Sequence, residues 1–254
     1  MKRAHNSRQS RVRWFAILAS AIALLAAPGA HAADVPGIGD WEHYHYSLDE
    51  TPITVVLIHD SGKRDFPVLI IPRSYVYFAN GAPSSSEGAL PESLETNDLG
   101  LAFTEPDGSA WSTAIKEYMT EHDVSSSAAG KALRPFRYLV RLSPNTNTAY
   151  AETVRANTVR NFTLIGEPYP GIQEYSATGG TSSFFLGSEG DEFLQAYCYN
   201  PLNAVYFCNY NFEIVKDISA VATFLDFRAH GGRDYANRRV RLARQVVCRF
   251  IADC

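Results

Sequence analysis

The sequence predicts an α+β fold, in which a mostly antiparallel sheet has its helices on one side and a C-terminal amphipathic helix packs on one face. Three patterns predict it. Apolar or alternating segments of strand length follow one another with turn residues between them, which favours antiparallel pairing. These strands do not alternate regularly with helices, as they would in a parallel sheet. Near the C-terminus, apolar residues recur at steps of three and four, which is the period of an amphipathic helix.

Residues 1–32 have the three parts of a secretory signal peptide. The first 13 residues carry five basic side chains and no acidic one, and an apolar run follows from Trp14 to Ala27. This run has 14 residues, whereas a membrane-spanning helix needs about 20. The small residues of Ala30-His31-Ala32 predict cleavage between Ala32 and Ala33. We therefore expect a periplasmic or secreted protein, and an uncleaved membrane anchor is the alternative.

Removal of the signal peptide makes the chain strongly acidic. Five of the 23 basic residues are lost and none of the 27 acidic ones, so residues 33–254 carry a net charge of 18 − 27 = −9. A negative net charge disfavours nucleic acid and anionic membrane surfaces as partners, and it favours a basic protein partner. We expect residues 33–254 to form a single α+β domain, with a candidate subdivision near residues 125–135.

The first part of the mature chain predicts a hairpin and then a long loop. The apolar runs Ile53–Ile58 and Val68–Ile71 flank turn residues at Asp60–Asp65, which is the pattern of two neighbouring strands. Residues 80–100 are rich in Gly, Pro, Ser and acidic residues and have no sustained period. They predict a long exposed loop, which is also a candidate contact surface for a partner.

The middle of the chain predicts two helices and several strands. The small residues of Ser125–Lys131 predict a flexible segment. Ser109 is a candidate N-cap for a helix in which five large side chains recur at helical spacing: Trp111, Ile115, Tyr118, Met119 and His122. A second helix is expected at Tyr150–Arg160, and strands are expected at Phe136–Leu142, Asn161–Ile165, Phe184–Leu186 and Phe193–Tyr199.

The C-terminal segment predicts two strands and a long helix. Tyr206–Ile214 alternates apolar with polar residues, and Ile218–Phe227 is a further strand. From Asp234 onward, an apolar stripe runs through Ala236, Val240, Ala243, Val247, Phe250 and Cys254. We expect the arginines of this helix to face mostly away from the stripe: Arg238, Arg239, Arg241, Arg244 and Arg249.

The cysteines at positions 198, 208, 248 and 254 are predicted to form two disulfides. An even number of cysteines favours disulfides in an oxidising compartment, and the spacing lacks the short gaps of zinc sites and redox motifs. Cys198 and Cys208 are equally far from Asn203, so an odd-length hairpin loop around Asn203 would place them directly opposite. The preferred pairing is Cys198–Cys208 with Cys248–Cys254, and crossed pairings are the alternative.

No linear motif identifies a catalytic residue, a cofactor-binding site or a metal site. The sequence has no phosphate-binding loop, no metalloprotease helix and no G-x-S-x-G elbow. An alternative function rests on the H-x-H pair His43 and His45, with His59 and His230 as further candidates, because imidazoles can bind metal or act as bases. We nevertheless expect a protein that is not an enzyme and that uses no cofactor.

Two segments resemble a group of small exported proteobacterial proteins. The segment Ile70-Ile71-Pro72-Arg73-Ser74-Tyr75-Val76 is similar to the strand exit "I-P-(basic)-x-Y" of that group. The hairpin with Cys198 and Cys208, the strand after it and a helix ending in Phe250-Ile251 resemble its C-terminal unit, although Tyr235 lies nearest to the position of its usual tryptophan. Several members are encoded beside antibacterial effectors of type VI secretion, so the resemblance implies a periplasmic immunity factor that caps a toxin.

The leading hypothesis from the sequence is therefore a periplasmic, non-enzymatic binding protein of the immunity type, which inhibits an antibacterial toxin. Its expected partner is a basic effector protein, and no stable membrane anchor is expected to remain after signal cleavage. The first alternative is a secreted hydrolase or metalloenzyme that uses the four histidines named above. The second is an envelope structural or adhesion component, which would call for repeats or a large exposed apolar patch.

Overall fold

The computed structural model describes residues 47–254, except residue 64 and residues 83–88, 177–181 and 200–206. The described residues belong to one compact unit. The predicted signal peptide with its cleavage site at Ala32 and Ala33, and the histidines His43 and His45, lie outside the described residues.

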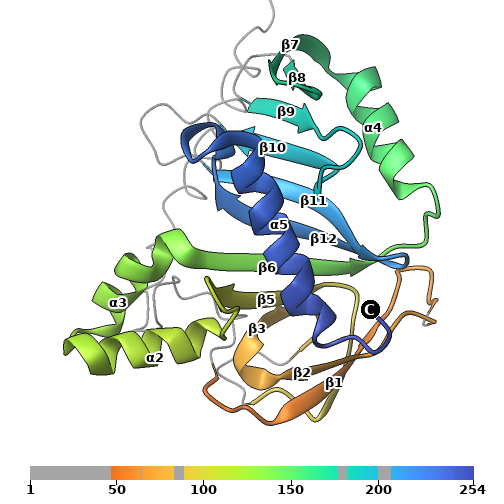
Figure 1. Ribbon diagram of the computed structural model, residues 1–254. Helices are drawn as coiled ribbons and strands as arrows, with labels where there is room; N and C mark the ends of the chain where they lie inside the picture. The colour runs from red at the N-terminus through yellow and green to blue at the C-terminus, as the bar shows by residue number, and fades with distance from the viewer. Residues whose placement is uncertain (1–46, 64, 83–88, 177–181, 200–206) are drawn as a thin grey trace, which may run out of the picture. The chain divides into compact units, whose positions relative to one another are not determined.

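The larger of two sheets has nine strands, and all their pairings are antiparallel (Figure 1). The predicted α+β class with a mostly antiparallel sheet is confirmed. In spatial order the strands are β3 (Val76–Ala79), β5 (Leu99–Thr104), β6 (Arg137–Pro144), β12 (Ile218–Leu225), β11 (Phe207–Val215), β10 (Gln195–Tyr199), β9 (Ser182–Leu186), β8 (Ile172–Ser176) and β7 (Thr163–Tyr169).

The smaller sheet has three strands in the order β2-β1-β4. Strands β1 (Pro52–Leu57) and β2 (Leu69–Pro72) form the predicted antiparallel hairpin. Strand β4 (Ser93–Thr96) lies on the other side of β1 and runs parallel to it. The prediction of one long exposed loop at residues 80–100 is therefore wrong: Leu94 and Thr96 are buried. Leu94 and Thr96 stand among polar residues in the sequence, so the hydrophobic pattern does not indicate this short strand.

The segment that follows the last helix also reaches the smaller sheet. The backbone N–H of Ile70 donates to the carbonyl oxygen of Phe250 at 2.9 Å. Leu69 and Ile251 form an antiparallel bridge. The chain after the helix thus lies along β2, on the side that β1 leaves open.

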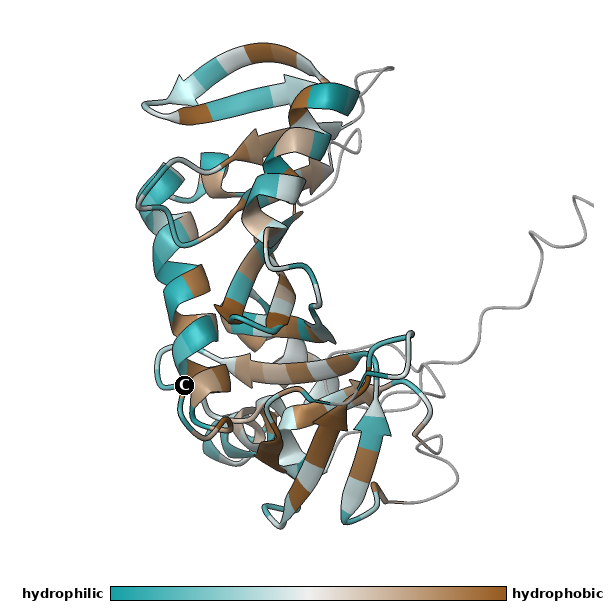
Figure 2. Cartoon of the chain, turned by 90° about the vertical axis from the view of Figure 1, so that its right-hand side faces the viewer, coloured by the Kyte–Doolittle hydropathy of each residue, from teal (hydrophilic) through white to brown (hydrophobic). Residues whose placement is uncertain are grey.

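Helix α5 (Gly232–Cys248) packs along one face of the nine-stranded sheet (Figure 1). Ala236, Val240, Ala243 and Val247 are fully buried, as the apolar stripe predicts. Figure 2 shows hydrophilic residues along the outer side of this helix. Burial of one valine side chain contributes about 1.5–3 kcal/mol, so this face stabilises the docked helix. The side chains that meet it come from the central strands: Tyr138, Val140, Leu142, Tyr210, Phe212, Ala222 and Phe224.

The opposite face of the sheet is covered only at its two ends by described residues. At one end, helices α2 (Trp111–His122) and α3 (Ser126–Leu133) bury Trp111, Ile115 and Ala129 against Tyr77 and Ala102. At the other end lies α4 (Tyr150–Asn161), which confirms the predicted second helix. Its contacts with β9 and β10 are made by Phe162, which stacks on Phe184, and by Thr158, which accepts a hydrogen bond from Gln195. Helices therefore lie on both sides, and the prediction of helices on one side is wrong.

Helix α3 occupies the segment that the sequence predicts to be flexible. Its N-cap is Ser125, whose hydroxyl oxygen accepts a hydrogen bond from the backbone N–H of Ala128 at 3.3 Å. A serine cap followed by alanines is a good helix start, and Ala129 is fully buried. The cap predicted for α2 is also wrong, because Ala110 holds that position and the Ser109 hydroxyl lies 3.0 Å from that of Thr104.

Candidate functional site

Four central strands turn a set of side chains outward in the space between α2 and α3 at one end and α4 at the other. No described helix covers these side chains. We call this surface the open face. On each strand its residues alternate with residues buried under α5. Val221 on β12 is 38% exposed, whereas its neighbours Ala220 and Ala222 are buried. The open face comprises Arg137 and Arg141 on β6, Val221 and Thr223 on β12, Phe207, Asn209 and Asn211 on β11, and Tyr197 on β10.

The open face contains a hollow of about 380 Å³. Its walls combine two arginine cations, two aromatic rings and two uncharged polar groups, and none of the described residues that line it is acidic. They come from β6, β10, β11, β12 and the 3-10 helix η2 (Arg134–Phe136). The lining residues are Arg134, Arg137, Tyr197, Phe207, Asn209 and Thr223.

Each arginine near the hollow lies over an aromatic ring. The guanidinium carbon of Arg134 is 5.3 Å from the ring centre of Phe207, and that of Arg137 is 5.4 Å from the ring of Trp111. Attraction between a cation and the face of a ring favours such positions. Trp111 is 1% exposed and belongs to the core under α2. These contacts hold both positive charges beside the hollow before any partner arrives.

On its other side, the hollow is bounded by Tyr197, which ends a row of three neighbouring rings. Phe162 and Phe184 have ring centres 3.9 Å apart, and Phe184 and Tyr197 have ring centres 4.7 Å apart. The Tyr197 hydroxyl lies 3.0 Å from the hydroxyl of Ser182. Stacked rings have few rotamers, so this wall is rigid and costs little conformational entropy when a partner packs on it.

The polar groups of the hollow are mainly hydrogen-bond donors. The Thr223 hydroxyl donates to the side-chain oxygen of Asn209 at 2.7 Å. That bond uses the amide oxygen and leaves the amide nitrogen of Asn209 as a donor. A guanidinium also donates and never accepts. The hollow therefore suits a ligand that is rich in acceptors.

A second hollow, of about 570 Å³, lies beside α5. Next to it Arg239 forms an ion pair with Glu105, with Nη1 and Oε2 2.7 Å apart. The Tyr138 hydroxyl donates to the other oxygen of Glu105 at 2.7 Å, and burial raises the pKa of Tyr138 far above its ordinary value. The lining residues are Glu105, Pro106, Phe136, Arg238, Arg241, Leu242 and Gln245.

Arg239 is the exception to the prediction that the arginines of the last helix mostly face away from its apolar stripe. Its side chain is 1% exposed, and its guanidinium lies 4.2 Å from the ring centre of Tyr138. Its Nη2 also donates to the carbonyl oxygen of Pro135 at 3.0 Å. The other arginines of that set are exposed or half-buried, so the expectation fails at this position alone.

Both predicted disulfides are present. Cys198 and Cys208 are directly opposed in the ladder of β10 and β11, with Cα atoms 4.1 Å apart. The loop around Asn203 lies outside the described residues. Cys248 is bonded to Cys254, with Cα atoms 5.3 Å apart. That short distance is reached because α5 ends at Cys248 and the chain then turns back.

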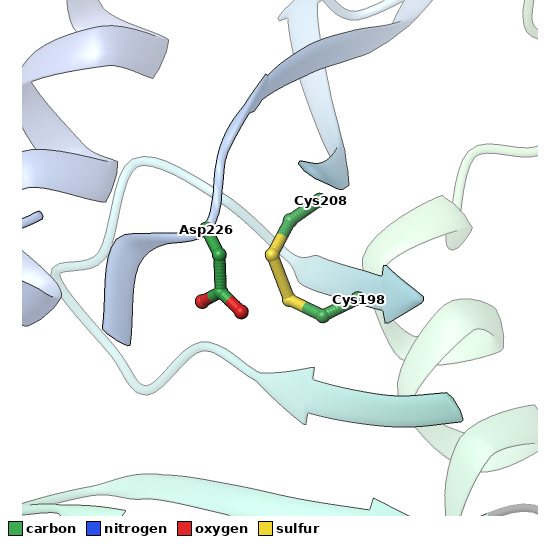
Figure 3. A group of neighbouring side chains, drawn as sticks. All are labelled: Cys198, Cys208 and Asp226. Carbon is green, nitrogen blue, oxygen red and sulfur yellow. A yellow bond between two sulfur atoms is a disulfide. The ribbon is translucent and has the colours of Figure 1, made fainter. Parts of the chain in front are cut away.

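Cys198, Cys208 and Asp226 bring potential ligand atoms within 4.8 Å of one another (Figure 3). Both sulfurs belong to the disulfide, so neither is the thiolate that a metal site needs. The Asp226 carboxylate instead forms an ion pair with Arg228 and accepts a hydrogen bond from its backbone N–H at 2.9 Å. This group therefore has a structural role.

The two described candidate histidines lie apart in the fold. His59 follows β1, where its Nδ1 accepts a hydrogen bond from the backbone N–H of Ser61 at 3.2 Å and closes a turn. His230 is exposed after η3 (Phe227–Ala229) and lies 5.8 Å from the ring of Tyr235. Among residues 47–254 as far as they are described, neither belongs to a group of three potential metal ligands.

Comparison with known proteins places the chain in no family. No family model matches it, and no curated protein matches it. A crystal structure of the iron-regulated outer membrane lipoprotein FrpD of Neisseria meningitidis aligns with a TM-score of 0.41 and 9% identity. The alignment covers 82% of this chain and 96% of that chain. A likeness at this level carries no functional conclusion. No described helix has the length and apolar character to span a bilayer.

Proposed function

We propose that this protein is a non-enzymatic binding protein of the cell envelope, which binds a partner protein through its open face. The observation that carries the proposal is the composition of that face. Arginine, tyrosine and phenylalanine line a hollow on the central strands of the nine-stranded sheet. Tyrosine and arginine carry much of the binding energy at protein interfaces, and aromatic residues are enriched there.

The two disulfides support a location outside the cytoplasm, because disulfides persist in oxidising compartments. The predicted signal peptide supports the same location. The finer proposal is a periplasmic immunity protein that inhibits an antibacterial toxin by covering it. That step rests on the resemblance of Ile70–Val76 and of the C-terminal unit to immunity factors.

The charge of the partner is a separate question. The net charge of −9 for residues 33–254 predicts a basic partner. Among the residues that define the open face, the charged ones are Arg137 and Arg141, and Arg134 stands beside them at the hollow; Glu213 follows on the same side of β11. Asp98 forms an ion pair with Arg141. The open face itself therefore gives no support to a basic partner.

Bacterial competition tests the proposal. A strain that lacks this gene is exposed to toxin-delivering sibling cells and is complemented with wild type, Val221→Arg or Val159→Arg. Val221 is 38% exposed on the open face, and Val159 is 53% exposed on α4, so the second substitution is a matched control.

We expect wild type and Val159→Arg to restore survival and Val221→Arg to fail while folding normally by circular dichroism. Full resistance of the strain without the gene would overturn the immunity role. Equal protection by both variants would show that the open face is not the binding surface.

A further inference from the structure

We infer that the hollow of the open face binds an acidic side chain, aspartate or glutamate, from a segment of the partner protein. This inference rests on the proposed protein-binding function and names the chemistry of the contact. The first observation is the charge of the residues that line the hollow. The described lining has two arginines and no acidic residue, and no ion pair among the described residues involves Arg134.

The geometry of the donors points to a carboxylate. A guanidinium presents paired N–H groups that match the two oxygens of a carboxylate. Arg134 and Arg137 line the same hollow from η2 and the start of β6. Asn209 adds an amide N–H, because its oxygen already accepts from Thr223 at 2.7 Å. Arg134, Arg137 and Asn209 thus place three donor-bearing side chains around one hollow.

The walls indicate that the acidic residue belongs to a polypeptide. Phe207 and Tyr197 line the hollow beside the arginines, and the stacked row of Phe184 and Phe162 continues from Tyr197. Apolar residues next to the acidic side chain would pack on these rings, which is a frequent arrangement at protein interfaces. Arg134 already rests on Phe207 at 5.3 Å, so little ordering is needed on binding.

The direct test uses an acidic probe and its neutral twin. The peptides acetyl-Glu-Tyr-Glu-amide and acetyl-Gln-Tyr-Gln-amide are titrated into isotope-labelled mature protein, and amide shifts are followed by NMR. We expect the acidic peptide to shift the signals of Asn209 and Thr223 and the neutral peptide to bind roughly 10- to 100-fold more weakly, the range expected for a charge-assisted hydrogen bond. Equal binding of both peptides, or shifts confined to another surface, would overturn the inference.

Charge reversal provides the matched variants. Arg134→Glu should abolish the shifts caused by the acidic peptide, whereas Lys131→Glu should preserve them, because Lys131 is exposed on neighbouring α3 and does not line the hollow. Inorganic phosphate is titrated as a further probe. If phosphate displaces the peptide at equal concentration, the hollow is a general anion site and the inference is wrong.

The peptide experiment and the competition experiment test different statements, so either one can fail while the other succeeds. Binding of the acidic peptide in the hollow, with full resistance of the strain without the gene, would refute the immunity role and keep the acidic contact. Loss of protection by Val221→Arg, with no binding of the acidic peptide, would keep the docking surface and refute the acidic contact.

Discussion

Arg239 and Glu105 form an ion pair of 2.7 Å although the arginine side chain is only 1% exposed. Replacing Arg239 with methionine would leave Glu105 and its neighbouring tyrosine hydroxyl without the balancing charge. We expect Arg239→Met to lower the free energy of unfolding by about 1–3 kcal/mol, because Glu105 is 24% exposed and water can solvate part of its unpaired charge. Urea denaturation measures this change.

The neighbouring arginine provides the control for that prediction. Arg238 is exposed, so Arg238→Met should change the free energy of unfolding by about 0.5 kcal/mol or less. Adding Glu105→Gln to Arg239→Met should recover part of the loss, because no charge then remains unpaired. Equal stability of the two single variants would contradict the structural role of the pair.

Asp191 makes the stability of the fold depend on pH. Its side chain is fully buried. Burial alone would raise the pKa of Asp191, but hydrogen bonds from Arg233, Asn237 and Ser188 lower it below its ordinary value. A carboxylate with a depressed pKa in the folded state stabilises the fold above its unfolded pKa of about 3.9. That contribution is lost as the pH falls through the folded pKa.

We therefore expect Asp191→Asn to be less stable than wild type at pH 7 by about 1–3 kcal/mol. The difference should shrink as the pH is lowered below about 4. Thermal unfolding followed by circular dichroism over a pH series checks both points. Glu189→Gln is the control, since Glu189 is exposed. A difference that is constant with pH would contradict the proposed ionisation.

The Cys198–Cys208 disulfide should contribute to stability through the unfolded state. It closes a loop with a sequence separation of 10, for which the chain-entropy estimate is about 2–3 kcal/mol. The double variant Cys198→Ala with Cys208→Ala should lose that amount in urea denaturation. Intact-mass analysis of wild type should show a gain of two hydrogens per disulfide on reduction. Untreated protein with thiols at both positions would contradict the pairing.

Two glycines should respond in opposite ways to a methyl group. A Cβ at Gly187 would overlap the backbone carbonyl oxygen of Phe193, which cannot move aside easily. A Cβ at Gly166 would meet nothing within 4 Å. We expect Gly187→Ala to destabilise by about 1–3 kcal/mol, as other overpacking changes do, and Gly166→Ala to be neutral or slightly stabilising. Similar melting temperatures for the two variants would contradict the tight approach at Gly187.

The features predicted well from the sequence are those set by local periodicity. The alternation in β11 places Cys208, Tyr210, Phe212 and Ile214 on the buried side, and the same alternation gives the cysteine register. The apolar stripe of α5 follows from its spacing in the same way. Such patterns hold because one face of each element must leave water.

Arg239 shows where residue type misled the prediction. It lies three residues after Ala236 and four before Ala243, both of which are buried. Its position on the helix therefore belongs to the apolar stripe, and the spacing could have revealed this. An arginine is normally exposed unless paired, and its partner Glu105 is far away in the sequence. Only the folded chain brings that partner close.

The open face could not be predicted for a related reason. Its hollow joins Arg134 and Tyr197 with Thr223, three residues that no local period connects. They meet because β6 pairs with β12, β12 with β11 and β11 with β10, an order that the hydrophobic pattern alone does not fix. The coverage of the two ends by α2, α3 and α4 depends on the same order.

The chain after α5, which lies along β2, has a consequence for self-association. Val68, just before β2, and Ile70, within it, are 45% and 59% exposed. An apolar strand with unsatisfied backbone groups is a template for pairing with a second molecule. Here Phe250 and Ile251 already occupy that position, and the Cys248–Cys254 bond constrains the turn that holds them there. Formation of this disulfide thus helps to keep the edge of β2 covered, and we expect its reduction to expose that edge to pairing with other molecules.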